Sequence, residues 1–226
     1  MQATDPFDKN ATLSKSYSPI SHPSTENEFS LLVKSYEPQP GGGVGHYLCG
    51  LSAGEEFKAK VKKSRVMHGD TAVLKRGWTH VAFLGGGTGV APLYQLLLLL
   101  LQDDAAQDLS FLNIQSTAKD ILLGDELENL VEQHPDRLKV TTVLTQENKA
   151  VGRGNLDLIR KTLPDPKLGD KVMIFICGKY GFVDFWGGEV QRAPPPPGKK
   201  KGPKIQGPLT GLLNEAGYDA SQVFKY

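Results

Sequence analysis

The segment best suited to chemistry is a glycine-rich turn at Gly85–Gly89, between the apolar run before it and a helical segment that starts near Val90. Glycine permits positive φ and lets the backbone approach a ligand closely. The first turn of the next helix offers unpaired N–H groups and a partial positive charge, a combination that binds pyrophosphate. Neither a Walker A sequence nor G-x-G-x-x-G is present. The alternative is a turn that only closes a tight strand–helix connection.

Other kinds of catalytic centre lack support in the sequence. The five histidines show no metal-ligand spacing, and they are His22, His46, His68, His80 and His134. No nucleophile elbow is present. The two cysteines, Cys49 and Cys177, do not make a disulfide framework, although a bridge between them is left open. We therefore expect no metal site and a reducing compartment.

Apolar strands alternate with helical segments from about Arg76 onwards. The expected strands are Val81–Leu84, Leu109–Ile114, Leu138–Leu144, Val172–Ile176 and Gln222–Phe224. The expected helices start near Val90 and cover about Asp120–His134, Asn155–Thr162 and Pro208–Ala216, the last ending at Gly217. This alternation predicts an α/β fold, with a parallel sheet, right-handed crossovers and flanking helices.

Residues 1 to about 70 have a different character, being rich in Ser, Pro and Gly. Phe29–Tyr36 and Glu56–Val61 have the composition or alternation of β-strands. We expect an antiparallel β domain over residues 1–72 and an α/β domain over residues 73–226.

Composition excludes several classes of partner. A formal charge of +1 over 226 residues argues against nucleic acid. The longest apolar run, Leu96–Leu101, is too short to span a bilayer, which needs about 20 residues. Met1–Ser16 lacks the apolar core of a signal peptide, so we expect no membrane span or targeting signal in this chain. Nothing in the sequence indicates an oligomeric state.

Gln191–Lys204 interrupts the α/β pattern. It contains four consecutive prolines, Pro194–Pro197, followed by Lys199–Lys201. Proline runs of this kind do not join a helix or a central strand. We expect a solvated insertion loop, and the alternative is an arm that binds a protein or an anionic membrane.

The glycine turn, read as Gly85–Leu96, resembles the nucleotide-binding signature of the ferredoxin-NADP reductase superfamily, and is most similar to that of the NADH–cytochrome b5 reductase family. Further segments resemble that family in order and spacing: Tyr17–Ser21, Gly42–Leu48, Thr117–Leu123, Cys177–Gly178, Gln206–Gly211 and Gln222–Tyr226. The last two are similar to the mitochondrial type. The resemblance extends over about Ser16–Tyr226.

The resemblance implies two cofactors, FAD and NADH, and a site for each. FAD contacts are implied for Lys15, Tyr17, Ser18, Pro19, Val33, Tyr36, Gly42, Gly43, Val44, Gly45 and Thr88. NADH contacts are implied for Lys34, Gly86, Gly87, Thr88, Gly89, Pro92, Thr117, Asp120, Cys177 and Gly178. Thr88 and Cys177 are the implied catalytic positions, and Asp120 implies a preference for NADH over NADPH.

The implied activity is transfer of a hydride from NADH to a flavin, followed by delivery of electrons to cytochrome b5 or a similar haem acceptor. A flavin β-barrel before the nucleotide-binding domain is implied as well, here only in part, because about fifteen residues precede Tyr17. The implied location is mitochondrial, at the outer membrane or the intermembrane side. The alternative is the cytosolic face of the endoplasmic reticulum, or the cytosol.

Four positions depart from the family pattern and keep a second hypothesis open. Lys15 occupies the position of the motif arginine, and Gly45 that of the serine in the phosphate turn. Lys62–Ser64 replaces a Gly-Pro of the family, and Lys179–Tyr180 replaces two prolines. Lysine lacks the bidentate fork of arginine. The second hypothesis is a flavin-free nucleotide-binding module with a non-catalytic role.

Several of these residues could instead have structural roles that involve no ligand. Thr88 could cap a helix, Cys177 could be a buried residue at the end of a strand, and Asp120 could begin a helix, where acidic residues are favoured. Lys34 could be a solvent-facing charge on a strand.

Overall fold

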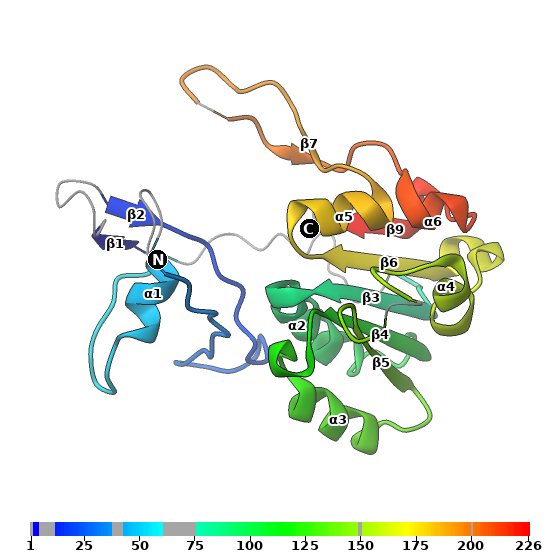
Figure 1. The fold of residues 1–226 in the computed structure, drawn as a ribbon, viewed down its shortest axis with the longest axis horizontal. Coiled ribbons are helices and arrows are strands. Elements are labelled where there is room, and N and C mark those ends of the chain that lie inside the picture. Colours follow the sequence, from blue (N-terminus) through cyan, green and yellow to red (C-terminus); the bar gives the residue numbers. More distant parts are fainter. Residues whose placement is uncertain (1, 5–11, 38–42, 61–75, 149–150, 200) are drawn as a thin grey trace. The chain divides into compact units, whose positions relative to one another are not determined.

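The computed structural model describes residues 2–4, 12–37, 43–60, 76–148, 151–199 and 201–226. Its contacts divide the chain into unit 1, Met1–Thr71, and unit 2, Ala72–Tyr226. Figure 1 draws both units.

Unit 2 contains a parallel sheet with the strand order β5-β4-β3-β6-β9. The strands are β3 (His80–Gly86), β4 (Asp108–Gln115), β5 (Leu138–Leu144), β6 (Val172–Cys177) and β9 (Val223–Lys225). The five strands expected from the sequence are thereby confirmed, except that Gln222 lies in a 3-10 turn before β9. Val81–Leu84 is fully buried, as is typical of a parallel strand covered on both faces.

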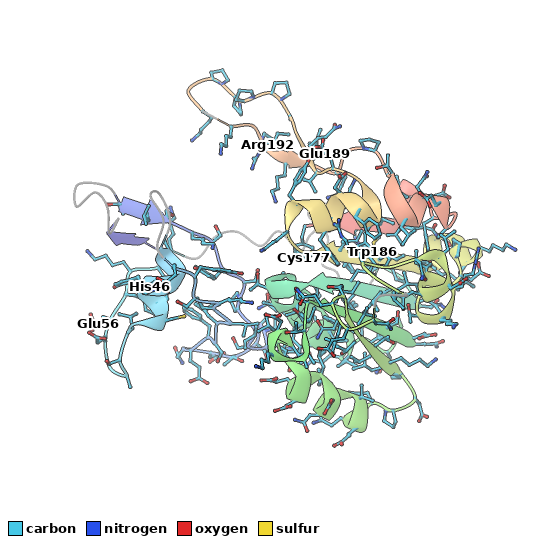
Figure 2. The ribbon with its side chains drawn as sticks, viewed as in Figure 1. His46, Glu56, Cys177, Trp186, Glu189 and Arg192 are labelled. Carbon is cyan, nitrogen blue, oxygen red and sulfur yellow. The ribbon has the colours of Figure 1, made fainter. Side chains whose placement is uncertain are left out.

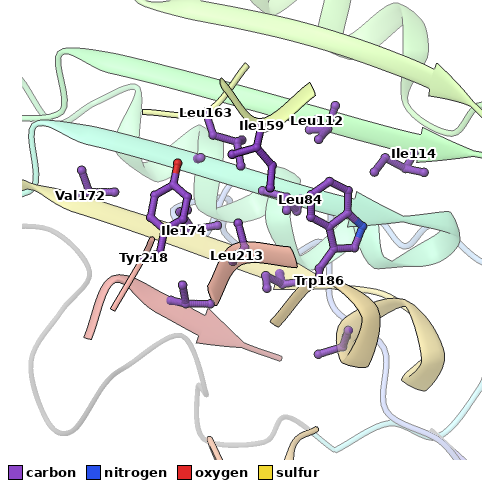
Figure 3. Packing of buried hydrophobic residues seen from close by; sticks show 14 of the residues in the cluster. Leu84, Leu112, Ile114, Ile159, Leu163, Val172, Ile174, Trp186, Leu213 and Tyr218 are labelled. Carbon is purple, nitrogen blue, oxygen red and sulfur yellow. The ribbon is translucent and has the colours of Figure 1, made fainter. Parts of the chain in front are cut away.

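Helices cover both faces of this sheet (Figure 1). They are α2 (Val90–Leu100), α3 (Gly124–Gln133), α4 (Leu156–Thr162), α5 (Tyr180–Gly187) and α6 (Gly211–Glu215). On one face, Ile159, Trp186 and Leu213 from α4, α5 and α6 pack on Leu84 and other buried strand residues (Figure 3). Alternate strand residues point to opposite faces, and Phe83 stacks with Phe111 and Phe175 on the other one.

Two helices begin later than the sequence suggested, so two predictions of helix bounds were wrong. The expected Asp120–His134 helix is split, because Leu123 has a left-handed conformation (φ 57). Asp120 therefore ends a separate 3-10 turn, η2 (Ala118–Asp120), before α3 begins. The expected Pro208–Ala216 helix starts only at Gly211, which has a positive φ of 67.

The other helix predictions had mixed outcomes. The helix expected near Val90 is α2. Asn155 is the N-cap of α4, because its side chain accepts a hydrogen bond from Leu158 N at 2.8 Å. Helix α5 was not anticipated. The chain also forms the 3-10 turns η1 (Gly87–Gly89), η3 (Pro166–Lys171) and η4 (Ala220–Gln222).

Unit 1 has little regular structure among its described residues. Strands β1 (Gln2–Thr4) and β2 (Thr12–Ser14) pair antiparallel, and helix α1 covers Val44–Cys49. The two strands expected from the sequence were wrong. Phe29–Tyr36 contains only an isolated bridge from Leu31 to Pro19, Glu56–Lys60 has no regular structure, and Val61 lies outside the described residues. A strand requires a pairing partner as well as a suitable pattern.

The expected insertion loop contains a short ribbon that the sequence did not suggest. Strand β7 (Gln191–Arg192) pairs antiparallel with β8 (Lys204–Ile205). Prediction of a loop was therefore wrong at these positions, although the residues are exposed as expected.

Two features are absent from the described ranges. None of the helices there is long and apolar enough to cross a membrane. No group of three or more His, Cys, Asp or Glu side chains there is arranged to hold a metal ion.

Candidate functional site

The candidate nucleotide site lies where the strand order of the sheet reverses. From β3 the chain proceeds outward to β4 and β5, then returns to β6 on the other side of β3. In open α/β sheets, ligands bind in the crevice at the carboxyl ends of the strands, at such a reversal. The turn after β3 and the end of β6, at Cys177–Gly178, flank this point (Figure 2 labels Cys177).

Close backbone approach explains the glycines of the turn. A β-carbon on Gly86 would come within 2.7 Å of the Phe182 ring, and one on Gly89 would overlap the carbonyl oxygen of Cys177. Gly87 has a positive φ of 56 and open space around the position of a β-carbon. Only glycine satisfies these requirements together without strain.

The helix start after this turn has no side-chain cap. Neither η1 nor α2 receives a capping hydrogen bond from a side chain at its N-cap residue. The first N–H groups of a helix lack partners within the helix, so they remain donors for an anion. Thr88 is exposed and does not cap α2, so the alternative role of Thr88 as a helix N-cap is wrong. Pro92 lies half-buried in the first turn of α2.

A buried amide pair supports the turn from β4. Gln115 Nε2 donates to Asn113 Oδ1 at 2.7 Å and to the carbonyl oxygen of Gly87 at 3.4 Å. Asn113 is fully buried and Gln115 is 4% exposed. This pair therefore fixes the Gly87 peptide. Sequence analysis missed both residues, although two amides two positions apart at the end of an apolar strand must share one face.

The Thr117–Asp120 segment lies at the same carboxyl edge, after β4. Thr117 Oγ1 donates to Asp120 Oδ2 at 2.9 Å, and Glu147 Oε1 accepts from Ala118 N at 3.1 Å. The bond from Thr117 orients the Asp120 carboxylate, and the bond to Glu147 holds the backbone of the same turn. The structure thus brings Thr117 and Asp120 to the edge that carries the glycine turn.

Cys177 is held as a neutral thiol. Burial raises its pKa to about 12, while Lys204 and a backbone hydrogen bond from Gly178 oppose the shift. The Phe182 ring covers the next residue, since a β-carbon on Gly178 would come within 2.6 Å of it. Phe182 was missed because α5 was missed. A neutral thiol provides a small surface without charge beside the turn.

The residues expected to bind flavin partly converge in unit 1. A β-carbon on Gly45 would lie 3.0 Å from the carbonyl oxygen of Lys34, 3.4 Å from the Tyr17 hydroxyl and 3.7 Å from Val33. The Tyr17 hydroxyl is buried without a hydrogen-bond partner in the described part of the chain. Burial, with a smaller contribution from Cys49, raises the pKa of Tyr17. An orphaned phenol of this kind fits a site that a polar ligand completes.

The other residues of this part of unit 1 that were expected to contact a cofactor lie near Tyr17 or Val33 in the sequence. Lys15 Nζ lies 5.7 Å from the centre of the Tyr17 ring, and Lys34 Nζ lies 6.0 Å from that of Tyr36. Ser18 and Pro19 are half-buried, and Pro19 bridges to Leu31.

The expected phosphate turn of unit 1 leads directly into α1. Gly43 has a φ of 120 and precedes Val44, the first residue of α1, which is buried. Gly42 and Lys62–Ser64 lie outside the described residues.

An open, mainly apolar pocket of about 510 Å³ adjoins the converging residues of unit 1. Its lining includes Leu31, Val33, Leu48 and Phe57. Tyr17 and this pocket together fit a flavin-bearing domain, while neither by itself identifies the ligand.

Each unit contains a segment that matches a known protein family. Residues 83–187 match the family model of the oxidoreductase NAD-binding domain, and residues 3–67 match that of the oxidoreductase FAD-binding domain. A relative from Saccharomyces cerevisiae, NADH-cytochrome b5 reductase 2, is 31% identical over 227 residues, which cover 96% of this chain and 68% of the relative. The chain belongs to the NADH–cytochrome b5 reductase family. It therefore carries the FAD-binding and NAD-binding domains of an oxidoreductase.

Two further relatives define the extent of the likeness. NADH-cytochrome b5 reductase 2 of Neurospora crassa is 33% identical over 233 residues, covering 98% of this chain and 60% of the relative. The chain thus spans about 60% of that family member. The crystal structure of the cytochrome b5 reductase domain of Ulva prolifera nitrate reductase has the same fold, with a TM-score of 0.72, 21% identity, and coverage of 100% of this chain and 81% of that one.

Proposed function

We propose that this chain is an FAD-dependent NADH reductase that passes electrons to cytochrome b5 or a similar haem acceptor. The observation that carries the proposal is the backbone contact between the glycine turn and Cys177–Gly178 at the point where the strand order reverses. That edge offers uncapped N–H groups for a diphosphate and, beside them, a neutral thiol. Membership of the family supplies the reaction class.

Different residues of unit 2 bind different parts of NADH. The amides of Gly87–Gly89 bind the diphosphate, because α2 starts there without a cap. Asp120, oriented by Thr117, binds the adenosine ribose and repels a 2′-phosphate. Cys177 lies against the nicotinamide as an uncharged surface, and Thr88 is exposed on the turn to contact it.

Bound FAD would accept two electrons as a hydride and release them singly, which is the chemistry that this chain's side chains lack. The fit to FAD rests on the orphaned Tyr17 hydroxyl, the adjacent pocket and the match to the FAD-binding family model. Tyr17, Ser18 and Gly43–Gly45 would hold FAD, with Lys15 as the basic partner of its diphosphate. The contact of Thr88 with FAD stays a prediction.

A direct experiment tests the proposal. The purified chain is titrated with FAD, its visible spectrum is recorded, and NADH is added without oxygen. We expect a two-band flavin spectrum that bleaches on addition of NADH, and reduction of soluble cytochrome b5 when that protein is added. A chain that takes up no FAD and reduces no acceptor would contradict the proposal.

One observation favours the second candidate, a flavin-free nucleotide-binding module. Position 45 has no room for a serine side chain without a shift, because a β-carbon there already lies 3.0 Å from the Lys34 carbonyl oxygen. Gly45 lacks the hydroxyl donor of the family turn, and a serine there would require the Lys34 carbonyl to shift. NADH binding by a colourless chain in the same titration would identify this candidate.

We also propose a mitochondrial location, at the outer membrane or the intermembrane side. Its support is the similarity of Gln206–Gly211 and Gln222–Tyr226 to the mitochondrial type of reductase. Subcellular fractionation with marker proteins for each compartment tests this, and recovery with endoplasmic reticulum or cytosolic markers would contradict it.

A further inference from the structure

The segment Gln191–Ile205, here named the basic arm, projects from the body of unit 2 (Figure 1), and Lys200 within it lies outside the described residues. At its base, Gln191 pairs with Ile205 and Arg192 with Lys204. Ala193 N donates to the carbonyl oxygen of Pro203 at 3.0 Å, which continues the ribbon beyond the two strands. The Arg192 guanidinium donates to the carbonyl oxygen of Gly202 at 2.9 Å. These bonds tie the two sides of the arm together.

The far end of the basic arm is a tight turn. Lys199 N donates to the carbonyl oxygen of Pro196 at 3.0 Å, and Gly198 has a positive φ of 73. Proline followed by glycine at the two central positions is the combination favoured by a type II turn. Because each proline also fixes its own φ, the arm has few conformations to lose when it binds a partner.

Lys225 of the last strand, β9, holds the base of the basic arm through hydrogen bonds. Lys225 Nζ donates to the carbonyl oxygens of Glu189 at 3.3 Å and Pro208 at 2.8 Å, which flank the arm on either side (Figure 2 labels Glu189). It also donates to that of Gly187 at 3.1 Å. The Gln206 side chain pairs with the Lys225 backbone at 2.7 and 3.1 Å. The direction of the arm is therefore set by β9.

These hydrogen bonds also fix where the arm begins. Lys225 pairs with Ile176 in the register of β6 and β9, one residue before Cys177. Lys204 is close enough to Cys177 for its charge to act on the thiol. The arm thus starts at the carboxyl edge of the sheet, which is the edge that carries the nucleotide site.

Positive charge is concentrated on the basic arm. Residues 191–205 contain five basic and no acidic side chains, whereas residues 72–226 contain 18 basic and 17 acidic ones. The remainder of unit 2 thus has a formal charge of −4. Arg192 and Lys204 are exposed and directly opposite each other, an arrangement that is unfavourable in a free ribbon. An anionic partner would relieve this repulsion.

We propose that the basic arm docks the electron acceptor by binding an acidic face of that protein. The inference rests on the proposed function and deepens it. The charges of the described residues lie in two groups, Arg192 and Lys204 at the root and Lys199 and Lys201 near the turn, on a support that keeps their spacing. Such a pattern suits carboxylates at fixed positions on a folded surface. The turn itself has only Pro, Gly and Lys, so it lacks the large apolar side chains that anchor a segment in a bilayer.

Charge reversal at the arm tests the proposal in the full chain. Lys199→Glu/Lys201→Glu changes two exposed side chains near the turn. Lys167→Glu/Lys171→Glu is the matched control, because these exposed lysines lie in η3, before β6 and at the opposite edge of the sheet. KM for soluble cytochrome b5 is measured at low ionic strength and at about 0.5 M salt, where screening is strong. Bleaching of the flavin by NADH is measured in every variant.

The expected result is an increase of about tenfold in KM for cytochrome b5 in the arm variant at low ionic strength, which shrinks in high salt. The control should stay near the unaltered chain, and bleaching by NADH should be the same in all three. Equal KM values in arm variant and control, with bleaching intact, would overturn the docking proposal alone. Absence of bleaching in the unaltered chain would instead overturn the proposed function.

Cosedimentation with phosphatidylserine vesicles distinguishes binding to an acidic protein from binding to an anionic lipid surface. We expect the unaltered chain and the arm variant to bind these vesicles equally. Loss of vesicle binding in the arm variant together with an unchanged KM would assign the arm to a lipid surface and overturn the proposal.

Discussion

Gly89 lies against the carbonyl oxygen of Cys177 so closely that a β-carbon on Gly89 would overlap it. The turn after β3 and the end of β6 are therefore in backbone contact, and main-chain atoms line this side of the candidate nucleotide site. This relationship explains why glycine is needed at position 89, where the φ of −64 is open to any residue.

Substitution of Gly89 should damage both stability and binding. We expect Gly89→Ala to lower the free energy of unfolding by about 1–3 kcal/mol, because the methyl group has to displace backbone atoms. NADH affinity should fall with it. Gly87→Ala is the comparison, since position 87 has space and only its positive φ opposes alanine, at a cost of about 1–2 kcal/mol. Urea unfolding and NADH fluorescence titration measure both effects. Tighter NADH binding by Gly89→Ala than by Gly87→Ala would contradict this account.

The amide pair beneath the turn should affect NADH binding without touching NADH. Gln115→Leu leaves Asn113 Oδ1 buried without its donor, so we expect a loss of about 1–3 kcal/mol in unfolding free energy. It also frees the Gly87 carbonyl, so the Kd for NADH should rise severalfold. In Asn113→Leu/Gln115→Leu both partners are apolar, and stability should largely return while affinity does not. If affinity returned together with stability, Gln115 would have no role in positioning the turn.

Asp120 should set the choice between nucleotides. In Asp120→Ala the ratio of kcat/KM for NADPH to that for NADH should rise about tenfold or more, because a carboxylate near the ribose repels a 2′-phosphate. Asp136→Ala, at an exposed position before β5, is the matched control for loss of one negative charge. An equal ratio in the two variants would place Asp120 outside the site.

The Cys177 thiol should make the chain less stable in alkali. Its pKa is raised from the ordinary value of 9.0 to about 12, so the folded state resists ionisation that the unfolded state permits. The contribution is fully present below pH 9 and is lost as the pH rises from about 9 to about 12. Urea midpoints between these limits should fall more steeply for the unaltered chain than for Cys177→Ala. Parallel slopes would show that the thiol is not buried.

Alkylation offers an independent check of the same thiol. Cys49 is exposed and should react with iodoacetamide at about pH 8, whereas Cys177, half-buried and with a raised pKa, should react slowly. Peptide mass spectrometry distinguishes the two sites. Equal labelling would contradict the burial of Cys177.

Sequence analysis predicted unit 2 well because its strands are long, apolar and covered on both faces. Val172–Ile176 and Val81–Leu84 stand out for this reason, and the glycine turn between β3 and α2 is visible from composition alone. Helix α5 was not predicted because Gly181 and Gly187 weaken the helical pattern of its sequence. The amides of Asn113 and Gln115 were not recognised because their role depends on a contact with Gly87, 28 residues from Gln115.

Unit 1 was predicted less well for a different physical reason. The alternation in Glu56–Val61 indicates a segment that could be half-buried in a sheet, but pairing depends on a neighbour distant in sequence. The convergence of Tyr17, Val33 and Gly45 was expected only through family resemblance, since no periodicity links these positions. Local pattern predicts elements, and it does not predict which elements meet.

The uneven charge of unit 2 also has a consequence at distances beyond contact. A body of net charge −4 with a +5 projection has a large electric dipole moment. In the field of an acidic protein, this dipole feels a torque that turns the projection toward the approaching surface before collision. The Debye length is about 8 Å at physiological ionic strength, so the orientation operates only over the last few solvent layers. A productive encounter would then depend less on random rotation and more on salt.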